Sequence, residues 1–219
     1  DWQQLIESLP QRANGIVAVS PTVDGQGYLT RGARRKSVSI SGIIPERHNQ
    51  VISLSDKMIS GRYFGLSSGE VLLGVRLAAD LRLKIGDKIR LTGSEQTSAG
   101  FTVAGIFDSG FRNLDDGAAL VTLHDAQSIF GLGNAVTSIG IKLSNIYNAN
   151  DVADAIANQI SYEVRSWMRD NQSLLSGLRA QTIFSSMIRL STVIAAAFSI
   201  ASILFMSVTS RRREIGILK

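Results

Sequence analysis

"LSTVIAAAFSIASILFMSVTS", residues 190–210, contains 21 consecutive residues without a charged side chain. A helix of this length spans about 31 Å, close to the roughly 30 Å hydrocarbon core of a bilayer. Arg189 precedes it, and the heavier cation cluster Arg211–Arg213 follows it. Because cations concentrate on the cytosolic side of membrane helices, we expect the C-terminal end in the cytosol. The alternative, a buried helix of a soluble core, does not explain the cations at both ends.

Small residues recur within this segment at a helical spacing. Ser191, Ala195 and Ser199 follow one another every four residues, which places them on one face of a helix. Small side chains let a second membrane helix approach closely. This pattern favours packing within a bundle of helices over a solitary anchor.

The charge of the chain is concentrated near its C-terminal end. The 219 residues carry a formal charge of +5, but residues 1–189 hold 19 Lys and Arg against 17 Asp and Glu. A generally basic nucleic-acid-binding domain is therefore excluded, and no nucleic-acid partner is expected. The basic stretch "RGARRK" (31–36) lacks interleaved aromatic residues and is interpreted as a solvated hairpin. The absence of cysteine excludes disulfides and thiol chemistry.

The residues before the membrane segment predict an α+β fold with two lobes of mixed strands and helices. Strands are expected over 15–23, 36–44, 71–73, 88–92, 101–107, 118–123, 138–143 and 161–168, and helices over 1–9, 75–83, 124–131 and 148–160. Gly86-Asp87 is expected to form a tight turn, and Asn150 or Asp151 to cap the last of these helices.

A single long helix is predicted to follow. No proline occurs from Asn171 onward, so one helix of roughly 60 Å can run to Arg213. The expected organisation is an exported core domain over 1–170, a stalk helix over 171–189, a transmembrane helix over 190–210 and the start of a cytosolic region over 211–219. A rigid stalk of this kind can transmit force.

Some short stretches match motifs of catalytic or metal-binding sites, but each has a simpler structural interpretation. Gly65–Gly69 ("GLSSG") matches the nucleophile elbow of hydrolases, but it precedes a strand, so a turn is expected. His48 and His124 lack partners at metal-ligand spacing, and Asp115-Asp116-Gly117 is interpreted as a turn. No phosphate-binding loop is present. We expect no catalytic residues, no metal, no cofactor and no ATP hydrolysis by this chain.

Several stretches together resemble the FtsX/MacB-type ABC transporter permeases. "SRRREIGILK" (210–219) resembles the turn after the second transmembrane helix of that family. "GEVLLGVRLAADLRLKIGDKIRL" (69–91) is similar to its exported-domain signature, and the similarity continues through "FTVAGIFDSGF" and "AALVTLHDAQSIFGLGNAVTSIGIKL". "SGIIPE" (41–46) and "YEVRSWMRDNQSLLSGL" (162–178) resemble the lipoprotein-releasing, LolC/LolE-type permeases most closely.

The resemblance implies a non-catalytic permease subunit in the bacterial inner membrane, with residues 1–189 periplasmic. Its implied partners are a cytosolic ABC ATPase subunit, a second permease subunit in a homodimer or heterodimer, a lipoprotein substrate and a periplasmic carrier. The ATPase-coupling region implied by the family comprises Arg213, Glu214, Ile215, Gly216 and Leu218. The same arginines could serve only as anchors at the membrane surface.

Some features depart from this family or fit another class. The loop "GSEQTSAG" (93–100) is short, which argues against direct docking of a carrier. A MacB-like efflux permease and a single-pass membrane receptor or binding ectodomain remain alternatives. Because the chain begins at Asp1 and ends just after its apolar segment, we expect it to be part of a longer protein.

Overall fold

A computed structural model describes residues 2–93 and 97–215. The chain divides into two compact units, Asp1–Val164 and Arg165–Lys219, and each is described by itself.

The first unit is a mixed α/β domain. Its strands are β1 (Ile16–Arg31), β2 (Arg34–Ile43), β3 (Met58–Gly61), β4 (Glu70–Gly74), β5 (Lys88–Thr92), β6 (Ser98–Phe107), β7 (Ala118–Thr122) and β8 (Ser138–Leu143). Its helices are α1 (Trp2–Arg12), α2 (Pro45–Val51), α3 (Val75–Asp80), α4 (Arg112–Gly117), α5 (Leu123–Ile129) and α6 (Ala149–Ala157), with short 3₁₀ turns at Ser55–Lys57 and Ile146–Asn148.

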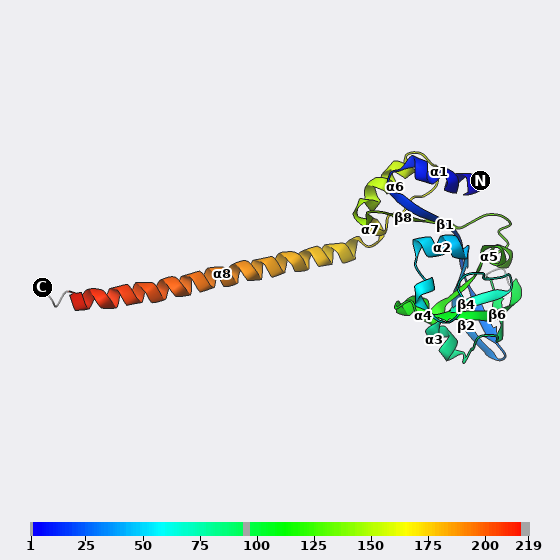
Figure 1. Cartoon of the computed structure of the whole chain (residues 1–219), viewed down its shortest axis with the longest axis horizontal. Coiled ribbons are helices and arrows are strands. Elements are labelled where there is room, and N and C mark those ends of the chain that lie inside the picture. Colours follow the sequence, from blue (N-terminus) through cyan, green and yellow to red (C-terminus); the bar gives the residue numbers. More distant parts are fainter. Residues whose placement is uncertain (1, 94–96, 216–219) are drawn as a thin grey trace. The chain divides into compact units, whose positions relative to one another are not determined.

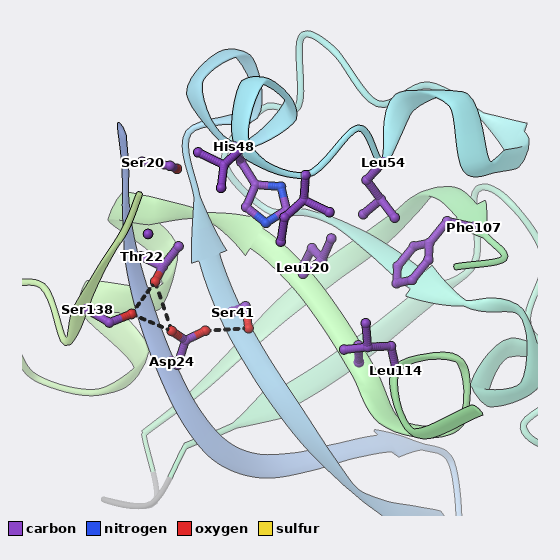
Figure 2. Close-up of a pocket in the computed structure, with 14 residues that line it drawn as sticks. Ser20, Thr22, Asp24, Ser41, His48, Leu54, Phe107, Leu114, Leu120 and Ser138 are labelled. Atoms are coloured by element: carbon purple, nitrogen blue, oxygen red, sulfur yellow. Dashed lines mark hydrogen bonds between the residues drawn. The ribbon is translucent and has the colours of Figure 1, made fainter. Parts of the chain in front are cut away.

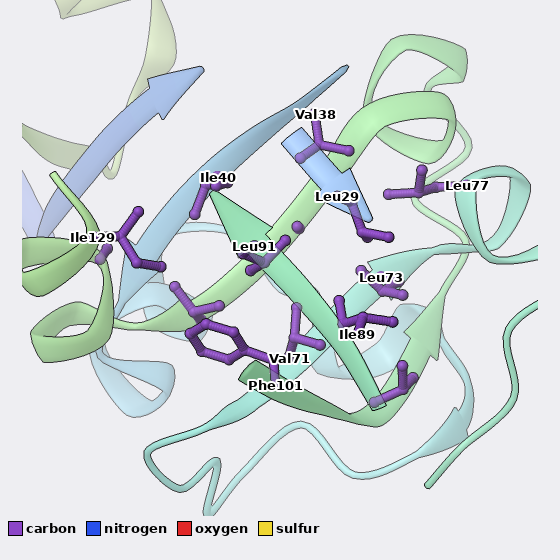
Figure 3. Packing of buried hydrophobic residues seen from close by; sticks show 14 of the residues in the cluster. Leu29, Val38, Ile40, Val71, Leu73, Leu77, Ile89, Leu91, Phe101 and Ile129 are labelled. Carbon is purple, nitrogen blue, oxygen red and sulfur yellow. The ribbon is translucent and has the colours of Figure 1, made fainter. Parts of the chain in front are cut away.

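Six of these strands pair in a closed circuit. The order β2-β7-β4-β6-β5-β1 returns to β2 through the antiparallel hairpin of β1 and β2, as in a small barrel. Two of the pairings, β2 with β7 and β4 with β6, are parallel. Closure leaves these strands without a free edge and directs alternate side chains inward. Leu29, Ile40, Leu73, Leu91 and Val71 are fully buried in the resulting core (Figure 3).

Strand β1 belongs to both lobes of this unit. Its first part, from Ile16 to Thr22, pairs with β8, whereas Val23 to Arg31 pairs with β2. The smaller lobe packs α1 and α6 against β1 and β8 around a second apolar cluster of Ile6, Leu9, Ala13, Val19 and Ile156. The expected two-lobed α+β architecture is confirmed (Figure 1).

The long course of β1 was only partly predicted. The expected strand ended at residue 23, whereas β1 continues through Gly25 and Gly27 to Arg31. In the structure, a Cβ atom at Gly27 would stand 2.5 Å from the carbonyl oxygen of Thr92 on β5. Glycine therefore permits a close approach of β1 and β5 here and does not end the strand.

Helix α3 ends three residues before its predicted limit. Arg82 adopts a left-handed backbone with φ of 55°. The backbone nitrogen of Leu83 donates to the carbonyl of Ala78 at 2.8 Å, and that of Arg82 donates to the carbonyl of Ala79 at 3.0 Å. This pair of bonds is the Schellman arrangement that terminates helices. The predicted Gly86-Asp87 turn is confirmed, with φ of 87° at Gly86.

Two local predictions are wrong. Residues 161–166 form no strand, and residues 167–170 form a short helix, α7 (Trp167–Asp170), because the Ser166 hydroxyl accepts a hydrogen bond from the Met168 backbone at its start. Asn150 and Asp151 do not cap α6, which begins after Asn148. Instead, Asp151 lies in the first turn, where its negative charge interacts favourably with the positive end of the helix dipole.

The second unit consists of α7 and the long helix α8 (Gln172–Ile215), coloured from yellow to red in Figure 1. Helix α8 has 44 residues. This corresponds to about 66 Å at 1.5 Å per residue. The predicted uninterrupted helix from about Asn171 to Arg213 is confirmed.

Candidate functional site

Helix α8 contains an apolar span long enough to cross a membrane. The span covers Ala180–Ser207, 28 residues, and none of it is buried within the structure. Large side chains project outward along it, and Phe198 and Phe205 are 71% and 76% exposed. Exposing such apolar area to water is unfavourable, whereas lipid or neighbouring helices can cover it.

Four of the hydroxyl groups within this span form hydrogen bonds inside the helix. Each donates to the carbonyl four residues earlier, at 2.8–2.9 Å: Ser186 to Thr182, Ser191 to Met187, Thr192 to Ile188 and Ser199 to Ala195. In a membrane, a polar group without a partner is costly, and these bonds remove that cost. The serine and threonine content is therefore compatible with a lipid environment.

The small-residue face expected from the sequence is present on α8. Ser191, Ala195 and Ser199 lie in the same helix at successive four-residue steps and are exposed. Arg189, the cation that precedes the predicted membrane segment, lies within the longer apolar span Ala180–Ser207. Helix packing by the three small residues stays a prediction.

The expected coupling region lies at the end of α8. Arg213, Glu214 and Ile215 belong to its last turn. Gly216 and Leu218 lie outside the described residues. Helix α8 thus extends without a break from residue 172 into the predicted coupling region. The coupling role itself stays a prediction.

The structure arranges Gly65–Gly69 as a turn, as expected. Positive φ angles of 68° and 78° at Gly65 and Gly69 form it. The backbone nitrogen of Ser67 donates to the Glu70 carboxylate at 2.8 Å. His48 instead pairs through Nδ1 with the hydroxyl of Tyr63 at 2.7 Å. No serine–histidine pair for nucleophilic catalysis occurs at this turn.

Asp115 has a role that no sequence motif predicts. The stretch Asp115-Asp116-Gly117 ends the short helix α4 and is not a simple turn. Asp115 is 3% exposed and accepts from both the backbone and the hydroxyl of Ser109. Within 2–93 and 97–215, no group of three or more His, Asp or Glu residues could hold a metal ion. The two hydrogen bonds from Ser109 give Asp115 a structural role.

The first unit matches a known protein family. Residues 1–159 match the model of the MacB-like periplasmic core domain. The extracellular domain of the noncanonical ABC-type transporter YknZ from Gram-positive bacteria has a similar structure, with a TM-score of 0.54 and 14% sequence identity. That similarity covers 72% of this chain and 80% of the YknZ domain, and it shows the fold alone.

Curated relatives extend the match through α8. The lipoprotein-releasing system transmembrane protein LolC of Xylella fastidiosa (strain Temecula1) is 31% identical over 100% of this chain and 55% of its own length. LolC of Neisseria meningitidis serogroup B is 29% identical, again over the whole chain and 56% of its own length. The macrolide export ATP-binding/permease protein MacB of Bdellovibrio bacteriovorus is 21% identical over 98% of the chain and 35% of its own length. The chain spans about half the length of these LolC proteins.

The family match covers most of the chain, and the LolC similarity continues through the apolar helix. The chain therefore belongs to the family of the MacB-like periplasmic core domain, as the resemblance in its sequence implies.

Proposed function

We propose that this chain is part of a non-catalytic permease subunit of an ABC transporter. The observation that carries the proposal is the similarity to LolC proteins over the entire chain, from α1 to the end of α8. A continuous helix of 44 residues, which follows a folded domain and includes a membrane-length apolar span, suits such a subunit. ATP hydrolysis would take place in a partner ATPase subunit.

The proposed placement follows the charge and hydropathy of the chain. Residues 1–170 form a periplasmic core, 171–189 a stalk, 190–210 the membrane segment, and 211–219 the start of the cytosolic coupling region. The subunit lies in a bacterial inner membrane and pairs with a second permease subunit. The small-residue face of Ser191, Ala195 and Ser199 is a candidate surface for that pairing or for another helix of the same subunit.

Helix α8 provides a physical route for coupling. A helix keeps its length when one end is displaced, because each backbone N–H is bonded to the preceding turn. Movement of Arg213–Leu218 by the ATPase would therefore shift the stalk and, through it, the periplasmic domain. Arg213, Glu214, Ile215, Gly216 and Leu218 are the proposed contacts.

Lipoprotein release from the inner membrane is the proposed transport activity, because the LolC relatives carry that name and match the whole chain. Efflux of small molecules is the second candidate, because a macrolide export permease also matches over 98% of the chain. A periplasmic carrier would accept a released lipoprotein.

The test is reconstitution of the full-length protein with its ATPase in proteoliposomes. We expect ATP-dependent release of a fluorescently labelled lipoprotein to an added carrier, and no ATP-dependent export of a macrolide. Glu214→Lys and Gly216→Trp should reduce release and ATPase stimulation together, whereas Glu7→Lys, the same charge change on the exposed face of α1, should not. Normal release by both variants would contradict the coupling role, and absence of ATPase co-purification would contradict the permease assignment.

A further inference from the structure

A cavity of about 270 Å³ lies within the first unit, beneath α2 and between strands of both lobes (Figure 2). This volume is slightly below the roughly 300–1,000 Å³ found for ligand pockets. An apolar cavity of about 150 Å³ takes up benzene, so by that scale this cavity has room for roughly ten non-hydrogen atoms. That is the size of one short alkyl chain with a small head group.

One part of the cavity wall is apolar. Leu54, Phe107 and Leu120 are buried side chains that line it. Ile52 and Leu114 also line it, yet they are 55% and 48% exposed. Apolar residues that are exposed beside a buried apolar wall give a ligand a continuous hydrophobic surface from solvent inward.

The other part of the wall centres on one carboxylate. Asp24 accepts hydrogen bonds from the hydroxyl groups of Ser41 at 2.7 Å, Thr22 at 2.9 Å and Ser138 at 3.1 Å (Figure 2). A carboxylate has about four acceptor positions, so one stays available. Asp24 is the acidic residue of the cavity wall, and the wall contains no Lys or Arg. Across the described part of the chain, no ion pair to Asp24 is formed.

One further polar group of the wall lacks a partner. Ser20 is 1% exposed, and its Oγ forms no hydrogen bond to any described residue. His48, which also lines the wall, pairs through Nδ1 with the hydroxyl of Tyr63. Buried polar groups nearly always have a hydrogen-bond partner. A hydroxyl group without one at a cavity indicates that a molecule bound in the cavity supplies the missing hydrogen bond.

We propose that this cavity binds a small amphiphile, a single alkyl chain of about eight carbons that ends in an ammonium group. The chain would lie against Leu54, Phe107 and Leu120, and the ammonium would donate to Asp24. A charge-assisted hydrogen bond of this kind is roughly twice as strong as a neutral one. An anionic head would be repelled by Asp24. The proposal goes beyond transport and does not depend on it.

The test uses the whole chain in lipid nanodiscs and octylamine that carries a diazirine on its alkyl chain. After photolysis, mass spectrometry should locate the label on the cavity wall, on peptides that contain Ile52, Leu114 or Leu120. Excess unlabelled octylamine should reduce this labelling at least fivefold, and octanoate at the same concentration should leave it within twofold. Equal competition by octanoate, or label confined to α8, would overturn the proposal without affecting the proposed transport function.

A matched pair of glycine variants tests the location. A Cβ at Gly140 would have the carbonyl oxygen of Ser20 at 3.7 Å and Val51 Cγ1 at 3.8 Å, which are ordinary contacts. Gly140→Leu should therefore fill the cavity and reduce labelling of its wall at least tenfold. Gly100→Leu, on β6 with no atom within 4 Å of its Cβ position, should not change it. Equal labelling of the two variants would overturn the site, and the competition with octanoate decides the question should Gly140→Leu fail to fold.

Discussion

The backbone nitrogen and the hydroxyl group of Ser109 both donate to the same carboxylate oxygen of Asp115, each at 2.8 Å. Asp115 is 3% exposed, and its backbone lies against Gly74, where a Cβ would stand 2.5 Å from the Asp115 carbonyl oxygen. The carboxylate thus fixes the loop after β6 to the short helix α4, at the end of strand β4. This region lies beside Leu114, which lines the mouth of the cavity.

Replacement of Asp115 tests this arrangement. Asp115→Ala should lower the free energy of unfolding by about 2–3 kcal/mol, because two hydrogen bonds to the carboxylate are lost and the backbone N–H of Ser109 is left without its acceptor. Urea unfolding of the solubilised chain, followed by circular dichroism, measures the change. Asp116→Ala is the matched control. Its ion pairs to Arg76 and Arg112 are at 3.9 and 3.4 Å with an aspartate side chain 42% exposed, so we expect a loss below about 0.5 kcal/mol. Similar losses in both variants would show that the Ser109 bonds contribute little.

The backbone at Arg82 provides a second prediction. Arg82 holds the left-handed conformation that ends α3, and its side chain is exposed. Glycine adopts this conformation without steric cost, so Arg82→Gly should raise the free energy of unfolding by about 1 kcal/mol. Arg82→Ala keeps the strain and should not stabilise. We expect a higher midpoint of urea unfolding for Arg82→Gly alone. If Arg82→Ala stabilises the chain as well, the effect comes from removal of the Arg82 charge and not from the backbone conformation.

His48 predicts a pH dependence of stability. Burial lowers the pKa of His48 below 6.5, although the charge of Asp24 opposes this shift. Between the folded and unfolded pKa values the unfolded state binds more protons, so the free energy of unfolding rises with pH across that interval. This contribution is fully present above about pH 6.5 and is lost as the pH falls below it. The neighbouring Tyr63, whose pKa burial raises, stays neutral throughout this range.

Unfolding in urea at several values between pH 5 and 7.5 measures this dependence. The wild-type free energy of unfolding should fall toward pH 5, and His48→Gln should flatten that slope. The interval avoids Asp80, whose pKa its hydrogen bond to Lys36 lowers from 3.8. An unchanged slope in His48→Gln would assign the pH dependence to other groups.

Local patterns in the sequence were sufficient for α8 and for most strands. An uncharged stretch without proline specifies a long helix from neighbouring residues alone. The closed circuit of strands was not predictable in this way, because it depends on contacts such as Gly27 against Thr92, which are far apart in sequence. Glycine there signals a close approach of two backbones, but the sequence does not say which backbones meet.

The cavity could not be predicted from the sequence for the same reason. Ser20 and Asp24 on β1 and His48 on α2 come from the first part of the chain, but Leu120 and Ser138, which line the same cavity, come from β7 and β8. The pairing of β1 with both lobes brings these residues together. An orphan hydroxyl such as that of Ser20 has no sequence signal at all, because only the folded structure shows which polar groups lack partners.

The small-residue face of α8 gives the last prediction. A helix turns by about 100° per residue, so Ala195 lies between Ser191 and Ser199 on one face, whereas Ala197 lies roughly 200° further round. Both alanines are exposed on α8. If a partner helix packs closely on this face, Ala195→Leu would separate the two backbones, and Ala197→Leu would not. We expect Ala195→Leu to reduce co-purification of the second permease subunit about tenfold, equivalent to about 1.4 kcal/mol, with Ala197→Leu near wild type. Both variants have the same composition and hydropathy, so a general effect on membrane insertion would reduce both equally, and that result would remove this face from the proposed interface.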